Sequence, residues 1–194
     1  MGKKEGYHAS ETKARAIYAL AQNGIPTLDS NTPSTKMLVL EAVRLLRETE
    51  VSVSTILSHM MELAKSLDEY ETVRSMNGVG DKLAVRLIAE IGDVRRFYSS
   101  KALIAYAGID APQYQSGNFY GTKRHISKRG NKSLRKAGYE VMKMLKVVKP
   151  EEDNAVYLYI LKKELEGKPK KVAKIAGLNK FLRIYYTRVK ELYS

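Results

Sequence analysis

Residues 73–97 read VRSMNGVGDKLAVRLIAEIGDVRRF, and this stretch is the most informative part of the chain for its fold. Gly78 and Gly80 free the backbone for a tight turn, and apolar residues then recur with the spacing of a helix. The stretch therefore predicts a helix-hairpin-helix, in which backbone N–H groups at the start of the second helix can approach a phosphate. Gly-x-Gly turns are also plain connectors between helices. The pattern alone thus leaves open whether Gly78, Gly80 and Lys82 contact nucleic acid.

Helical patterns dominate the sequence on both sides of this stretch. Residues 9–23 combine helix formers with a capping residue, Ser10, and end at a glycine. Further helices are predicted over residues 99–107, with a serine cap at its start, and over 131–148, 151–165 and 172–192. The apolar spacing places Val148 on the buried stripe of the second of these helices, and Ile175, Tyr185 and Tyr186 on that of the last, where the tyrosines are expected to pack in the core and at its edge. The strand-like candidates are residues 113–120 and 122–127, which could fold back at Gly121. The sequence predicts a mostly α-helical fold: a long coiled-coil-like helix or helical hairpin, then a compact helical domain with a helix-hairpin-helix and a short β-hairpin.

A heptad-like seam runs through residues 35–72. Its apolar residues alternate in steps of four and three once Glu50 is counted as a seam position, and they are Val39, Val43, Leu46, Val53, Leu57, Met60, Ala64 and Leu67. This pattern predicts a long helix or a helical hairpin with a coiled-coil face. The β-branched residues and serines of residues 48–55 (ETEVSVST) also fit a second interpretation, in which two core-packed helices meet there.

The charge balance points to an anionic partner. Lys and Arg number 34 against 21 Asp and Glu, which gives a net charge of +13 and an isoelectric point near 9.7. Such a surface gains free energy when it releases the counterions condensed on nucleic acid. There is no cysteine, which excludes disulfides and thiolate metal sites, and His8, His59 and His125 lack metal-ligand spacing. No apolar run approaches the ~20 residues that cross a bilayer, and the N-terminus lacks a secretion signal, so we expect a soluble intracellular protein.

Positive charge and glycine are concentrated in residues 114–139, YQSGNFYGTKRHISKRGNKSLRKAGY. We expect arginine forks and lysine charges here to bind phosphate, and Gly117, Gly121 and Gly130 to keep the backbone bare where a phosphodiester approaches. The candidate nucleic-acid-binding residues of this segment are Gly117, Lys123, Arg124, His125, Lys128, Arg129, Asn131, Lys132 and Arg135. Ser116 could attack phosphorus if arginines and backbone donors stabilise the transition state. A serine before a glycine is also ordinary turn chemistry, so the residues alone leave its role open.

Two stretches carry a resemblance to a known family. The first runs from residue 77 to 139, beginning NGVGDKLAVRLIAEIGDVRRF and ending QSGNFYGTKRHISKRGNKSLRKAGY, and the second is KPKKVAKIAGLNKFLRIYYTRVKELY at residues 168–193. Together they resemble the C-terminal transposase domain of the insertion-sequence "one-ten" family. By this resemblance Ser116 corresponds to the serine of the family's Ser-Gly motif, the nucleophile that becomes joined to a DNA phosphate. Residues 126–131 and 134–135 correspond to the family's downstream Ile-Ser-Lys-x-Gly-Asn and Leu-Arg elements.

The resemblance implies a DNA recombinase that mobilises its own insertion sequence through a phosphoserine intermediate. Full-length family members have an N-terminal RuvC-like domain with four acidic metal ligands, then a coiled coil, then the transposase domain. We therefore expect the following parts: the tail of a RuvC-like domain at 1–34, a coiled coil at 35–72, and a transposase domain at 73–194 with the helix-hairpin-helix at 73–97, the serine and basic region at 112–148 and C-terminal helices at 151–193.

The resemblance also implies partners and cofactors. These are DNA, a structured noncoding guide RNA and further copies of the chain in a dimer or tetramer, in the cytoplasm at the nucleoid and without a membrane. No metal ligand is expected within this chain, and Mg²⁺ is expected only with the RuvC-like domain, so we expect the chain alone to be inactive. The alternative is a non-catalytic nucleic-acid-binding protein derived from a truncated transposase, and a third possibility is an RNA-binding module without a DNA role.

Overall fold

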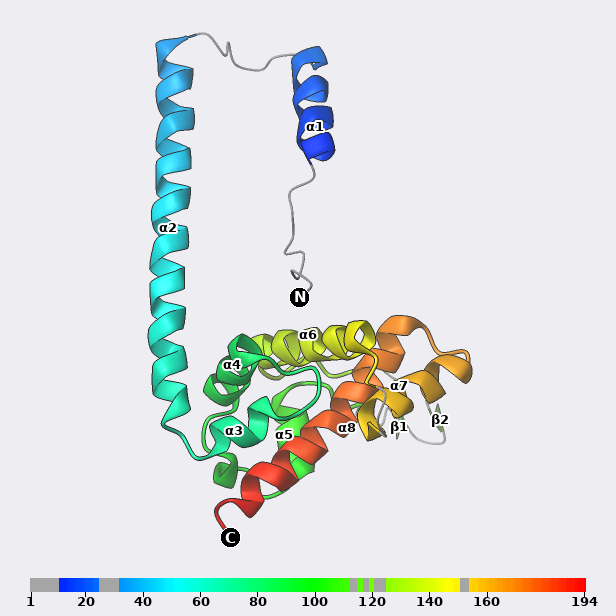
Figure 1. The fold of residues 1–194 in the computed structure, drawn as a ribbon. Helices are drawn as coiled ribbons and strands as arrows, with labels where there is room; N and C mark the ends of the chain where they lie inside the picture. Colours follow the sequence, from blue (N-terminus) through cyan, green and yellow to red (C-terminus); the bar gives the residue numbers. More distant parts are fainter. Residues whose placement is uncertain (1–10, 25–31, 112–114, 117–118, 121–124, 151–153) are drawn as a thin grey trace. The chain divides into compact units, whose positions relative to one another are not determined.

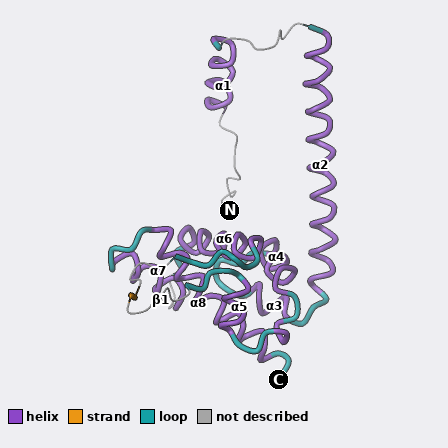
Figure 2. Tube along the Cα trace, turned by 180° about the vertical axis from the view of Figure 1, so that it is seen from behind, coloured by secondary structure: helices purple, strands orange, loops and turns teal. Residues whose placement is uncertain are grey.

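Helices account for most of the described backbone, which confirms the mostly α-helical fold class (Figure 2). The computed structural model describes residues 11–24, 32–111, 115–116, 119–120, 125–150 and 154–194. The chain divides into two units, residues 1–53 and 54–194. None of the described helices is both long and apolar enough to cross a membrane.

The first unit contains α1 (Glu11–Asn23) and the N-terminal part of α2 (Pro33–Lys65) (Figure 1). α2 runs without a break through residues 48–55, so the long helix is present and the interpretation of two helices meeting there is wrong. Side chains of the predicted seam lie exposed on α2, for example Val39, Leu46 and Val53, which are 57%, 60% and 59% accessible. Near the end of α2, in the second unit, Ala64 is buried in the core.

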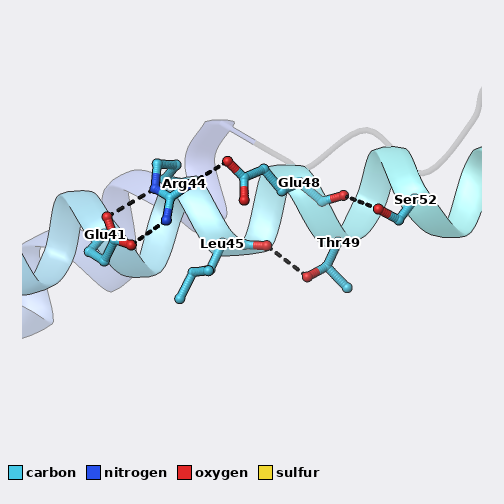
Figure 3. A network of polar contacts seen from close by, with 6 residues as sticks. All are labelled: Glu41, Arg44, Leu45, Glu48, Thr49 and Ser52. Carbon is cyan, nitrogen blue, oxygen red and sulfur yellow. Dashed lines mark hydrogen bonds and ion pairs between the residues drawn. The ribbon is translucent and has the colours of Figure 1, made fainter.

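Several polar side chains of α2 form hydrogen bonds or ion pairs within the helix itself (Figure 3). Arg44 forms ion pairs of 2.5 Å with both Glu41 and Glu48. The hydroxyls of Thr49 and Ser52 donate to carbonyl oxygens one turn earlier. These bonds occupy the groups that would otherwise favour a turn, which explains why the helix continues through a segment poor in helix formers.

In the second unit, α3 (Glu69–Arg74) and α4 (Asp81–Ile91) are joined by the turn that the two glycines predict. Gly78 has a φ of +83°, which favours glycine. A Cβ at Gly78 would lie 2.8 Å from Leu145 Cγ of α6 (Lys132–Val148). The apolar face that predicted α4 is buried, and its residues are Ala84, Leu87, Ile88 and Ile91. The turn is therefore held tightly by α6 on one side.

A short 3₁₀ helix, η1 (Val94–Arg96), leads into α5 (Ser100–Tyr106). The Ser99 hydroxyl accepts from the N–H of Ala102, so the serine cap predicted for this helix is present. After α5 the backbone at residues 106–110 lies against residues 127–131, through hydrogen bonds from Ser127 N to Asp110 O and from Lys128 N to Gly108 O, at 2.8 and 3.0 Å.

Much of the core of the second unit forms where α8 (Lys170–Glu191) packs against α5, α6 and α7 (Ala155–Leu165). Gly138 of α6 packs closely against Leu178, and Gly177 of α8 packs closely against Ile160. A Cβ at either position would overlap the partner side chain, so these contacts require glycine. The buried residues of α6 and α8 include Leu134, Val141, Met142, Leu145, Leu178, Phe181, Leu182, Tyr185, Tyr186 and Val189. Each large side chain buried in this way contributes about 1.5–3 kcal/mol of transfer free energy.

Two residues depart from the predicted buried stripes. Val148, placed on the buried face of α6, is 58% exposed in the last turn of the helix, where it lines a surface hollow beside the start of α4. Ile175, placed on the buried face of α8, is only half-buried and lines a surface groove. The tyrosines of α8 pack in the core as predicted: Tyr185 is buried, and Tyr186 donates to the Phe97 carbonyl at 2.9 Å.

Two short strands, β1 (Gln115–Ser116) and β2 (Phe119–Tyr120), form an antiparallel pair. Gln115 pairs with Tyr120 and Ser116 with Phe119. The hairpin is present, but the prediction that it folds back at Gly121 is wrong. Only two residues separate Ser116 from Phe119, and their sequence, Gly-Asn, is one that two-residue hairpin connections favour.

Candidate nucleic-acid interface

A surface groove gathers most of the cationic candidates that the structure describes. It has a volume of about 680 Å³ and lies between the segment before α6, the first half of α6 and the start of α8. We call it the basic groove, and its lining residues are His125, Ile126, Lys128, Lys132, Arg135, Lys136, Tyr139, Lys171, Val172 and Ile175. Sequence positions 125–139 and 171–175 thus meet in one place.

The lysines of the basic groove are exposed, and none of them forms an ion pair with an acidic residue in the described part of the chain. The two acidic residues between positions 101 and 150 are engaged elsewhere. Asp110 accepts a hydrogen bond from the Ser127 hydroxyl at 2.5 Å, and Glu140 forms a 2.8 Å ion pair with Arg86 of α4. These carboxylates therefore do not offset the electrostatic repulsion among the groove lysines. This repulsion favours binding of an anion from outside the chain.

The position of the lysines within their helices supports the same conclusion. α6 begins with Lys132 and α8 with Lys170 and Lys171, and neither helix has an acidic residue in its first turn. A cation at a helix N-terminus opposes the helix dipole at a cost of typically 0.3–1 kcal/mol. The chain therefore gives up some helix stability to place positive charge at this groove.

The crossing of two backbone segments holds the loop that carries His125, Lys128 and Arg129. Lys128 adopts a φ of +56°, which is uncommon for a residue with a side chain, and its N–H donates to the Gly108 carbonyl. Asn131 N donates to the Tyr106 carbonyl at 2.6 Å. The loop before α6 is thus tied to the end of α5 along its length, which fixes where its cations lie.

Gly130 corrects one sequence-based prediction. We expected it to leave the backbone bare for a phosphodiester, but the space beside it is filled by protein. A Cβ at Gly130 would lie 2.7 Å from the Tyr106 carbonyl carbon and 2.5 Å from Gly108 N, and still closer to the Tyr106 oxygen. Gly130 is therefore required for the backbone crossing rather than for a ligand.

Two candidate ligands, Asn131 and Arg135, make contacts within the protein. The Asn131 oxygen accepts from Leu134 N and caps α6, while its amide donates to Glu90 at 2.9 Å and to the Tyr106 hydroxyl at 3.2 Å. Both amide hydrogens are thereby used. Arg135 donates from Nη1 to the Ala107 carbonyl at 2.9 Å while also lining the basic groove.

Tyr106 lies at the centre of this anchoring cluster. The hydrogen bond from Asn131, followed by the contact with Arg96, lowers the pKa of Tyr106, although burial opposes the shift. The Arg96 guanidinium lies over both the Tyr106 and the Phe97 ring, at 4.6 and 4.7 Å from their centroids. These contacts stabilise the end of α5 and with it the loop before α6.

The turn of Gly78 and Gly80 differs from the basic groove in its surroundings. A Cβ at Gly80 would meet nothing within 4 Å, so this glycine is open to solvent at the start of α4, while Gly78 packs against α6. The hollow beside the turn is lined mainly by apolar side chains, and Lys82 stands next to Asp81. Asp81 in turn accepts hydrogen bonds from Tyr70 and Arg74.

The remaining candidate site residues are Ser116, Gly117, Lys123 and Arg124, and the structure describes only the backbone of the first. Ser116 is placed in strand β1, and its side chain lies outside the described part. Gly117, Lys123 and Arg124 also lie outside the described residues. Among the described residues no group of three His, Cys, Asp or Glu side chains could hold a metal ion.

The structure adds residues that sequence reasoning did not select. Tyr139, Lys171, Val172 and Ile175 line the basic groove but were assigned to helix packing or left out. For Lys171 a signal existed, because lysines in the first turn of a helix oppose its dipole. No pattern in the sequence shows that the start of α8 lies beside the start of α6.

Comparison with known proteins finds similarity to proteins that act on DNA, a polyanion, which is consistent with the positive charge of the basic groove. Residues 70–157 match the family described as "Transposase IS116/IS110/IS902 family". A 73-residue stretch is 38% identical to the "Transposase for insertion sequence element IS1111A" of Coxiella burnetii. A 114-residue stretch is 32% identical to each "Pilin gene-inverting protein" of Moraxella bovis and Moraxella lacunata. The region from α3 to the start of α7 is therefore similar to proteins that move or invert DNA segments.

The matches cover part of each protein. They take in 38% and 59% of this chain, but only 20% of the Coxiella transposase and 34% of the two Moraxella proteins. The family match contains β1, β2, the crossing of residues 106–110 with 127–131, and the α6 side of the basic groove.

Proposed function

We propose that this chain acts as the transposase domain of a DNA recombinase, which cuts and exchanges DNA strands through a phosphoserine intermediate at Ser116. One observation carries the proposal: residues 70–157 match a transposase family, and that region contains both Ser116 and most cations of the basic groove. The gene-inverting relatives support the same chemistry, since inverting a DNA segment requires strands to be cut and rejoined.

The reaction uses the Ser116 hydroxyl as nucleophile. The serine hydroxyl loses its proton and its oxygen forms a bond to phosphorus, while the bond from phosphorus to one sugar oxygen breaks and that oxygen takes up a proton to become a hydroxyl. Attack by a hydroxyl of another strand reverses the step, joins the new strands and frees the serine. Because the phosphoester bond is exchanged rather than hydrolysed, no external energy source is needed.

The basic groove and the loop before α6 hold the DNA for this reaction. Lys128, Lys132 and Lys136 supply charge that no acidic side chain of the described residues pairs with, and His125 and Arg129 stand on the segment that leads away from the strands. Lys123, Arg124 and Gly117 complete the set by resemblance. Asn131 and Arg135 act mainly by positioning this loop through their contacts with α5.

Three further parts of the proposal come from the family resemblance. The exposed seam of α2 pairs with other copies of the chain in a dimer or tetramer. Burial of apolar heptad positions such as Leu46 and Val53 in a coiled coil stabilises the assembly. A RuvC-like domain supplies the acidic ligands for Mg²⁺. A structured noncoding RNA guides the choice of DNA, and the open Gly80 end of α4 contacts a DNA backbone as a helix-hairpin-helix.

A covalent trapping experiment tests the nucleophile. The chain is incubated with Mg²⁺, a radiolabelled DNA bearing the ends of the element, the guide RNA and a RuvC-like domain supplied in trans or fused. We expect a labelled protein band that survives denaturing electrophoresis and disappears in Ser116→Ala. The matched control is Ser133→Ala, an exposed serine of α6, which should keep the band. A band that persists in Ser116→Ala, or shifts with Ser133→Ala, contradicts the assignment.

A non-catalytic nucleic-acid-binding protein is the second candidate. The groove itself favours it, because exposed lysines that form no ion pair within the described part of the chain bind a polyanion whether or not a reaction follows. Equal DNA binding by the wild type and Ser116→Ala, with no adduct from either, would support this candidate. Salt-dependent binding to RNA but not to duplex DNA would instead support an RNA-binding module.

A further inference from the structure

The basic groove contains a feature that phosphate binding does not explain. Three of its lining side chains are apolar, Ile126 of the loop before α6 and Val172 and Ile175 of α8, and we call these three residues the apolar floor. Val172 is 50% exposed, and Ile126 and Ile175 are half-buried, so apolar area faces solvent between the lysines. A phosphate gains nothing from such a floor, and exposed apolar surface inside a cationic rim favours a ligand with an apolar face and negative charge at its edges.

The rim of the groove is positive on both of its sides. Lys128, Lys132 and Lys136 stand on the side of α6, and Lys171 stands on the side of α8. Tyr139 also lines the groove and has the Lys174 ammonium 5.7 Å from its ring centroid. A ligand that lies on the floor therefore meets lysines from α6 and α8 and an aromatic ring.

A second hollow extends the apolar floor along α8. It shares Ile126, Val172 and Ile175 with the basic groove and continues to Ile109 and Ala176. Its further margin carries the cations Lys180 and Arg183. The apolar lining of the two hollows together forms one apolar strip, and cations line both hollows.

We propose that this strip binds an unpaired nucleotide of a DNA strand, with its base on Ile126, Val172 and Ile175 and its flanking phosphates on the lysines. In a duplex the faces of the bases are covered by their neighbours, so only an unpaired base offers an apolar face to the floor. Bases pack on aromatic and apolar side chains in proteins that take single strands, while a positive groove follows the phosphates. The inference rests on the proposed DNA function and specifies it, because it assigns the groove to a strand that is already opened.

Binding to matched probes tests this inference. Fluorescence anisotropy is measured with the full chain and four labelled probes of one sequence: a duplex, the duplex with one unpaired bulged nucleotide, the DNA single strand and the RNA single strand. We expect the bulged and single-stranded DNA to bind at least about fivefold more tightly than the duplex, since packing one base contributes about 1 kcal/mol or more. Val172→Asn, which keeps the charge and changes an exposed side chain, should remove that preference and leave duplex affinity within about twofold.

Two control variants make the result specific. Leu165→Asn changes a side chain that is 89% exposed on α7 outside the groove, and it should behave as the wild type with every probe. Lys136→Ala should weaken all probes alike, because it removes a phosphate contact and leaves the floor intact. Circular dichroism spectra matching the wild type establish that each variant is folded.

The outcomes separate this inference from the proposed function. Duplex and unpaired probes bound equally by the wild type, or a preference for unpaired DNA unchanged in Val172→Asn, overturn the base site while DNA binding stands. Tighter binding of the RNA strand than of the DNA strand also overturns it. Failure of every DNA probe to bind overturns the proposed function, and the base site with it.

Discussion

Substitution of Gly130 by alanine tests the backbone crossing on which the candidate interface depends. The added Cβ would meet backbone atoms on the facing segment, Gly108 N and the carbonyl group of Tyr106, and neither can move as a side chain would. Overpacking of this kind typically costs 1–3 kcal/mol. Separating the segments also weakens the bonds from Asn131 N to Tyr106 O and from Lys128 N to Gly108 O, each contributing about 1 kcal/mol. We therefore expect a loss of about 3–5 kcal/mol from an unfolding free energy that is typically 5–15 kcal/mol.

Urea denaturation followed by near-ultraviolet circular dichroism of the tyrosines measures this loss. The matched control is Gly80→Ala, since a Cβ there meets nothing within 4 Å and the backbone φ is −98°, so stability should change by less than about 1 kcal/mol. A Gly130→Ala variant within about 1 kcal/mol of the wild type would refute the argument. It would mean that the two segments separate easily and that the loop before α6 is not held as described.

Three further perturbations follow from individual contacts. Asn131→Ala removes the cap of α6 and two side-chain hydrogen bonds, and urea denaturation should show a loss of about 2–3 kcal/mol; a loss under about 0.5 kcal/mol would contradict the anchoring role. A double-mutant cycle of Arg86→Ala and Glu140→Ala should give a coupling of only about 0.5–1 kcal/mol, because both side chains are about a third exposed; a coupling above about 2 kcal/mol would be inconsistent with that exposure. The hydrogen bond to Glu69 raises the pKa of Tyr193 to about 12, so its stabilisation is present below about pH 10 and is lost as pH rises through about 12. Comparing the unfolding free energy of the wild type and Tyr193→Phe from pH 9 to 12 should show the difference shrinking with pH, and a constant difference would rule this out.

Local patterns were sufficient for most helices. The cap at Ser99, the turn at Gly78 and the buried face of α4 were predicted correctly because each depends on residues within one or two turns of the chain. The break predicted as an alternative at residues 48–55 did not occur, since hydroxyls such as that of Thr49 bond to the helix backbone instead of ending it. The hairpin was predicted to exist but with its turn at Gly121, whereas Ser116 pairs with Phe119, so that the two strands are separated by residues 117–118.

The candidate site was less predictable than the helices. The sequence identified Lys128 and Lys132 as candidate phosphate ligands, and both line the basic groove. It gave Asn131 as a further ligand and Gly130 as bare backbone for a phosphodiester, yet the contacts of both residues are with the end of α5. Nothing within residues 114–139 indicates that partner, because it comes from more than twenty residues earlier in the chain.

By itself the sequence determined the helical fold, the cationic character of the protein and the segment that carries its charge, since these follow from composition and short-range periodicity. Only the tertiary structure decided which of those residues face a ligand and which hold the fold together. The physical reason is that a side chain's role depends on its neighbours across the fold, and the backbone of α5 and the start of α8 reach this surface through packing between distant segments.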